Sequence, residues 1–192
     1  MLSVALACAV TACNGPRAND REDAGPHLVT TPTTSTTLDL PAQPPAEARS
    51  MEGDVLAAVE GFLRTTISVN DPPDPDHQDL ALYRTGAVLE HAVTAVTQNR
   101  LLGLAYRLPA ASSYSHVATV QSLTDERAVV RICVVDDALQ IALADGRVLN
   151  AAVATKLFET GLRRIDGRWK VAENALLDRW EGVTGCVASQ GS

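Results

Sequence analysis

The stretch that decides the fold is residues 156–177, KLFETGLRRIDGRWKVAENALL. Two stretches with alternating apolar residues flank Asp166-Gly167 in this segment. Asp-Gly between such stretches predicts a β-hairpin, because a type I′ turn needs positive φ at both central residues. The sequence therefore predicts two long antiparallel strands, Lys156 to Ile165 and Arg168 to Leu177.

The register of this hairpin separates apolar from charged side chains. With a two-residue loop, Phe158 is predicted to face Ala175. The same register sets Glu173 opposite Thr160. The predicted inner face carries Phe158, Leu162, Trp169 and Val171, with Thr160 and Glu173 as its polar members. The other face carries charged residues and is predicted to be solvated.

Four further strands are predicted between Pro109 and the hairpin, because the apolar period there changes from 3.6 to 2. They cover residues 113–123, 127–135, 139–143 and 148–153, with turn residues inside each pair. Residues 127–135 are apolar on most of both faces, so this strand is predicted to be central in its sheet.

Upstream of the strands, the sequence has the helical period. One apolar stripe predicts an amphipathic helix that Ser50 is placed to cap. The stripe consists of Val55, Leu56, Val59, Phe62, Leu63 and Ile67. A second helical region is predicted from Asp79 to Ala105, interrupted near Thr85-Gly86.

Residues 70–79 are rich in Asp and Pro and are predicted to be a loop. The prolines disturb the spacing of an EF-hand, and its central Gly and terminal Glu are missing. We therefore expect no metal site there.

Helices followed by an antiparallel sheet that ends in Gly167-Arg-Trp-Lys-Val171 resemble the nuclear transport factor-like cone fold, whose relatives include ketosteroid-isomerase-like and SnoaL-like domains. The resemblance covers about residues 51–187 and includes Trp180-Glu-Gly182. It implies an α+β domain in which helices cover a curved antiparallel sheet, and in which the apolar hairpin face lines a cavity for a small apolar ligand. A different α+β sheet with a filled core is the alternative.

Catalytic members of these families use a pocket carboxylate as base and a Tyr or Asp to stabilise an oxyanion. Glu173 is the one carboxylate that the register places toward the cone, whereas Tyr83, Tyr106 and Tyr114 have no assigned place. Asp136-Asp137 ends a strand, where a role in the turn is expected. The sequence contains no Ser/His/Asp, Cys/His or phosphate-loop constellation. We therefore expect a non-catalytic binding module without a cofactor, with a secreted isomerase- or cyclase-like enzyme as the alternative.

The N-terminus indicates export. Residues 1–12 carry no charge, and Val10-Thr-Ala-Cys13 resembles a bacterial lipobox. The resemblance implies that residues 1–12 are a cleaved signal peptide and that Cys13 carries a lipid anchor in the bilayer. A conventional cleaved signal and a buried first helix are the alternatives. Residues 13–50 are rich in Thr and Pro and are predicted to be a disordered tether with a span of about 35 Å.

Two cysteines remain if Cys8 leaves with the signal and Cys13 carries lipid. In an exported protein, Cys133 and Cys186 are expected to form a disulfide, whereas in a cytosolic protein they would be free thiols. Residues 188–192 are expected to be a short tail.

The composition suggests the kind of source genome and limits the classes of partner. Of 16 basic residues only Lys156 and Lys170 are lysines, a bias that suggests a GC-rich actinobacterial genome. The net charge of −7 argues against a nucleic-acid partner. The expected place is the outer face of the cytoplasmic membrane, and the expected partner is a protein or an apolar small molecule.

Overall fold

The computed structural model describes residues 46–186. The chain divides into two units, residues 1–41 and 42–192, and the described residues belong to the second. The predicted signal peptide at 1–12, the predicted lipid acceptor Cys13, the predicted tether up to residue 45 and the predicted tail at 188–192 lie outside the described residues. No helix in the described part is long and apolar enough to cross a membrane.

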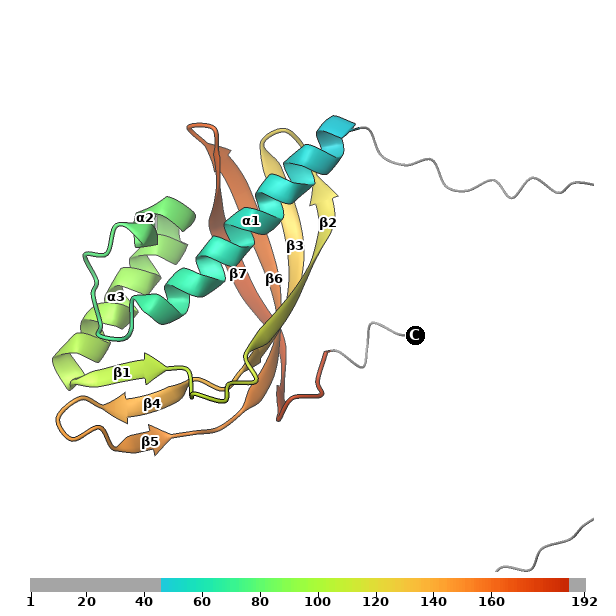
Figure 1. The fold of residues 1–192 in the computed structure, drawn as a ribbon. Helices are drawn as coiled ribbons and strands as arrows, with labels where there is room; N and C mark the ends of the chain where they lie inside the picture. Colours follow the sequence, from blue (N-terminus) through green and yellow to red (C-terminus); the bar gives the residue numbers. More distant parts are fainter. Residues whose placement is uncertain (1–45, 187–192) are drawn as a thin grey trace, which may run out of the picture. The chain divides into compact units, whose positions relative to one another are not determined.

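In the described residues, three helices, α1 to α3, come first in the chain, and seven strands, β1 to β7, follow them (Figure 1). The helices are α1 (Ala46–Ser68), α2 (Asp79–Tyr83) and α3 (Gly86–Leu102). The strands are β1 (Leu104–Arg107), β2 (Ser115–Leu123), β3 (Arg127–Asp136), β4 (Leu139–Ala142), β5 (Val148–Asn150), β6 (Ala154–Ile165) and β7 (Arg168–Glu181). The predicted α+β class is confirmed.

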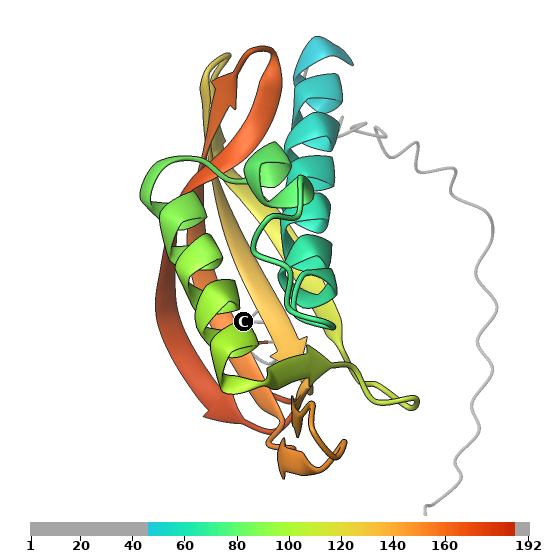
Figure 2. The same cartoon turned by 90° about the vertical axis from the view of Figure 1, so that its left-hand side faces the viewer.

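The strands form two antiparallel sheets. The large sheet has the order β2-β3-β6-β7, and the small sheet has the order β1-β4-β5. Both β3 and β6 lie inside the large sheet, so the central position predicted for residues 127–135 is confirmed. The helices α1 and α3 cover one face of the large sheet, which is its inner face here (Figure 2).

The main core lies between α1 and this inner face. Its buried α1 residues are Val55, Ala58, Val59, Phe62 and Leu63. They pack against sheet residues that include Val130, Ile132, Leu162, Trp169 and Val171. Burying one such side chain contributes about 1.5–3 kcal/mol, so the predicted stripe is what holds α1 on the sheet.

The start of the first predicted helix and the end of the second predicted helical region need correction. The first helix begins at Ala46, so Ser50 lies inside it and does not cap it; Ala and Glu at positions 46–48 favour an earlier start. The helical region ends at Leu102, because Gly103 adopts a left-handed conformation with φ 64°. The residues after Gly103 form β1, which the sequence analysis missed.

The hairpin register is right near the turn and wrong farther from it. Asp166 and Gly167 have φ of 50° and 76°, as a type I′ turn requires, and Leu162 faces Val171. Beyond that pair, the partner strand shifts by one residue, with Ala172 as the extra residue of a β-bulge. Phe158 therefore faces Leu176 and not Ala175.

The predicted disulfide is confirmed. Cys133 in β3 and Cys186 after β7 are joined, with Cα atoms 5.9 Å apart, and both are buried. The bond closes a loop of 53 residues and fastens the chain after β7 to the centre of the sheet.

Replacing both cysteines, in Cys133→Ser/Cys186→Ser, is expected to lower the free energy of unfolding by about 4 kcal/mol, because the unfolded chain loses its cross-link. Urea unfolding of the two proteins measures the difference. A reducing agent should bring the wild type to the level of the variant and leave the variant unchanged. Equal unfolding midpoints without reductant would contradict the stabilising role.

Candidate functional site

A cavity of about 400 Å³ lies between α1, the C-terminal half of α3 and the inner face of the large sheet. Its wall residues are Phe62, Leu63, Thr66, Ile67, Asn70, Ala95, Asn99, Tyr106, Tyr114, Ile132, Val134, Asp136, Ala138, Lys156, Phe158 and Asn174. This volume lies in the range of small-molecule sites.

Strand alternation builds the apolar part of the wall. Ile132 and Val134 of β3 point to the same face of the sheet, and they pair with Phe158 and Lys156 of β6. From the other side, α1 contributes Phe62 and Leu63, and Ile67 one turn further along its apolar stripe. The wall is therefore mainly apolar, with polar groups at a few places.

One ion pair lies in the wall. Lys156 Nζ donates a hydrogen bond of 2.6 Å to Asp136 Oδ2, and both side chains are about one-third exposed or less. Asp136 is the only carboxylate among the described wall residues. Its charge is thus already matched by a cation.

Two tyrosines also reach the wall. Burial, together with the nearby charges of Asp136 and Glu60, raises the pKa of Tyr114 to about 12. The hydroxyl of Tyr106 accepts a hydrogen bond of 2.8 Å from Gln140 Nε2. Tyr114 is therefore a neutral polar group at ordinary pH.

Asn70 connects the elements around the cavity. Its Oδ1 accepts a hydrogen bond of 2.8 Å from Asn99 Nδ2 of α3, and its Nδ2 donates to the Thr66 carbonyl of α1. Its carbonyl accepts from the Tyr106 amide of β1. One asparagine thus ties α1, α3 and β1 together at one end of the cavity.

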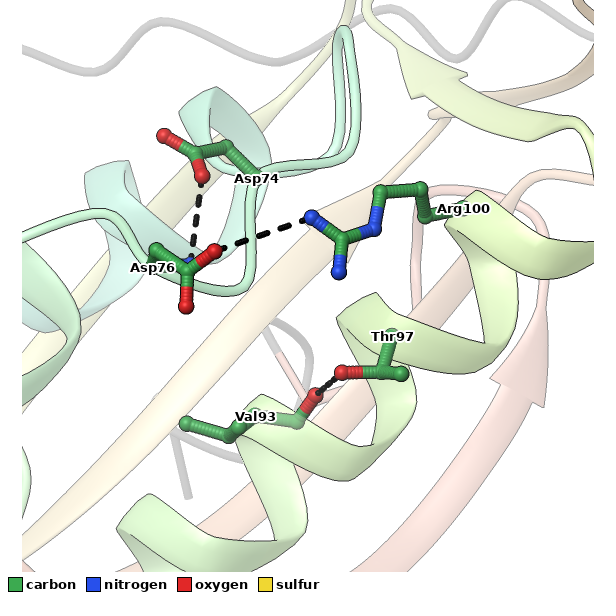
Figure 3. A network of polar contacts seen from close by, with 5 residues as sticks. All are labelled: Asp74, Asp76, Val93, Thr97 and Arg100. Carbon is green, nitrogen blue, oxygen red and sulfur yellow. Dashed lines mark hydrogen bonds and ion pairs between the residues drawn. The ribbon is translucent and has the colours of Figure 1, made fainter.

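The aspartates of the predicted 70–79 loop contact the protein itself. Asp74 accepts a hydrogen bond from the Asp76 amide, and Asp76 forms an ion pair of 3.7 Å with Arg100 of α3 (Figure 3). Arg107 holds the pKa of Asp71 below its usual value through hydrogen bonds. These contacts fasten the loop to the helix and strand beside it. No group of three metal-ligating side chains is assembled within residues 46–186.

Asp137 has a structural role. Burial acts to raise its pKa, but hydrogen bonds from Ser112 and Ser113 outweigh burial and lower it. These bonds fasten the segment before β2 to the end of β3, so the expected turn role suits Asp137. Its neighbour Asp136 also has a turn contact, since its Oδ1 accepts a hydrogen bond of 3.1 Å from the Ala138 amide. Asp136 lies in the cavity wall as well, which the sequence analysis did not foresee.

The β-bulge changes the predicted pocket. Glu173 faces Gly161, its side chain is 74% exposed, and it lies 3.5 Å from Arg163 on the solvated face. Asn174 takes the place opposite Thr160 that was predicted for Glu173. It accepts a hydrogen bond of 2.7 Å from the Thr160 hydroxyl. The carboxylate expected at this position is therefore replaced by an amide.

The other predicted pocket residues fall into two groups. Phe158 lines the cavity as expected. Leu162 and Val171 are buried in the core under α1, and Trp169 borders a separate hollow with Tyr83 near the hairpin turn. The apolar hairpin face is thus shared between a filled core and the cavity.

Arg84 was not foreseen at all. It follows α2, is 3% exposed, and its guanidinium carbon lies 4.5 Å from the centre of the Phe62 ring. Its Nη2 donates to the Phe62 carbonyl at 3.1 Å and to Thr66 Oγ1 at 2.6 Å. A buried arginine beside two cavity residues has no local signal in the sequence, because the contacts span 18 and 22 residues.

No family model and no curated protein matches the chain. Solved structures similar to it include the intermembrane space region of chloroplast protein ARC6, with 19% identity over 70% of this chain and 98% of that chain and a TM-score of 0.48. Kfla4162 from Kribbella flavida has 11% identity over 69% and 95%, with a TM-score of 0.45. An NTF2-like protein with a cystatin-like fold from Novosphingobium aromaticivorans has 18% identity over 74% and 92%, with a TM-score of 0.40. All three scores are below 0.5, so the α+β assignment rests on this chain's own helices and strands.

The raised pKa of Tyr114 predicts a loss of stability in alkali. Between pH 10 and pH 12 the folded protein keeps a phenol proton that the unfolded chain has lost, so this contribution is full below pH 10 and disappears by about pH 12. Tyr114→Phe has no such proton, and its urea midpoint should fall less than that of the wild type between about pH 9 and pH 11. Equal falls in both proteins would show that Tyr114 titrates normally.

Proposed function

We propose that this protein is a lipid-anchored, non-catalytic binding module with a nuclear transport factor-like cone domain, and that its cavity takes an apolar small ligand. The observation that carries the proposal is the mainly apolar cavity between α1, α3 and the sheet, with few polar groups in its wall. Cavities of this size and lining are the usual form of small-molecule sites. The alternative within this binding function is that the same site binds a partner protein.

The proposed location is the outer face of the cytoplasmic membrane of an actinobacterium. Support comes from the lipobox-like Val10-Thr-Ala-Cys13 and from the Thr- and Pro-rich residues that follow it. The disulfide between Cys133 and Cys186 agrees with an oxidising compartment. In this proposal, Cys13 holds the domain to the bilayer and the tether gives it reach.

The second candidate is a secreted isomerase- or cyclase-like enzyme. The observation that favours it is that Asp136, Tyr106 and Tyr114 share one cavity wall. A general base must be able to take a proton, and Asp136 is engaged by Lys156 at 2.6 Å. Glu173, the base expected from the register, lies on the solvated face. The binding role therefore has the stronger support.

Filling the cavity is expected to abolish ligand binding. Ala95 of α3 lines the cavity, so Ala95→Trp should weaken binding of the neutral dye Nile red by at least about tenfold. Ala87→Trp, at an exposed position on the same helix outside the cavity wall, is the matched control. Dye fluorescence measures both affinities. Equal binding by the two variants would place the dye elsewhere and remove the support for this cavity.

Lipidation is expected at Cys13 alone. In an actinobacterial host fed with labelled palmitate, Cys13→Ala should lose the label, because the thioether acceptor is gone. Cys8→Ala should keep it, since Cys8 would leave with the signal peptide. A Cys13→Ala protein that still carries the label would refute the anchor.

A further inference from the structure

The buried Arg84 lacks a counter-charge. No carboxylate within residues 46–186 forms an ion pair with it, and its Nη1 atom is buried without a hydrogen-bond partner. Burial lowers the pKa of Arg84 to about 10, so the guanidinium still carries its charge at neutral pH. A buried cation without a partner is costly, and a buried donor without an acceptor is rare.

The guanidinium lies next to the cavity. Phe62 and Thr66, which it contacts, are both wall residues, whereas Arg84 itself is not. Phe62 and Thr66 thus contact both the guanidinium and the cavity. A ligand in the cavity would reach Nη1 only if these side chains moved.

Charges of both signs lie around the cavity. Lys156 and Asp136 neutralise each other. Arg179 pairs with Lys156 in the large sheet and so lies on the same face of it, and its exposed side chain forms no ion pair within the described residues. Arg179 is thus an exposed cation on this face of the sheet, whereas Glu60, near the wall residue Tyr114, pairs with His116.

We propose that the ligand is an anionic amphiphile whose apolar chain fills the cavity and whose carboxylate or phosphate group pairs with Arg84. The apolar wall supplies the site for the chain, and the open donor of Arg84 supplies the site for the head group. A planar guanidinium with free N–H groups binds either oxyanion through charge-assisted hydrogen bonds. This inference rests on the proposed binding function and gives it a ligand class.

Three ligands of equal chain length test the proposal on the wild-type protein: dodecanoate, dodecyl phosphate and dodecanol. Titration calorimetry should show that at least one anion binds about ten- to a hundredfold more tightly than the alcohol, as expected for hydrogen bonds to a charged group. The tighter anion identifies the head group. If dodecanol binds as tightly as both anions, the ligand class is wrong and the binding function stands. If none of the three binds, the proposed function fails as well.

Two variants locate the selectivity. Arg84→Gln should lose the preference for the anions over dodecanol. Arg179→Gln, at the exposed cation on the same face, should keep most of that preference. If Arg179→Gln loses the preference and Arg84→Gln keeps it, Arg84 is not the head-group site. Circular dichroism checks that each variant folds, and if Arg84→Gln does not, the wild-type ligand series decides the ligand class.

Discussion

The structure depends on the pairing of β3 with β6. Ten consecutive residue pairs, from Arg127↔Arg163 to Asp136↔Ala154, join the two strands without a bulge. Because side chains alternate along each strand, this unbroken register puts Val130, Ile132 and Val134 on one face. The apolar stripe of α1 covers one end of that face and forms the core. The other end stays open as the cavity, with Lys156 and Phe158 in its wall.

Local signals predicted much of this fold. The Asp166-Gly167 turn, the apolar stripe of α1 and the interruption before Gly86 all depend on residues close together in the sequence, and the structure confirms them. The bulge at Ala172 was missed, because a two-residue turn fixes the register only until an extra residue enters. A glycine inside a strand is the signal that could have indicated it, since Gly161 lies opposite Glu173 at the shift.

The site was less predictable than the fold. Phe158 follows from strand alternation, but Asp136 and Tyr106 come to the cavity from the end of β3 and from an unpredicted short strand. The loop before β2 positions Tyr114. Arg84 directly follows α2 and lies beside Phe62 of α1, which is distant from it in the sequence. Such contacts depend on how elements pack, and no spacing within the sequence encodes them. The disulfide is the one long-range contact that was predicted, because Cys133 and Cys186 remain when Cys8 and Cys13 are assigned to the signal and the lipid anchor.

The bulge at Ala172 also decides which side chain of β7 lies opposite Thr160. Side chains on a strand change faces when the register moves by one residue. Deletion of Ala172 would remove the bulge and leave Asn174 opposite Thr160. Only a strand that kept Ala172 and paired it with Gly161 would bring Glu173 opposite Thr160, and a carboxylate would then replace the amide. The extra residue in β7 thus keeps an acidic side chain off the inner face of the sheet.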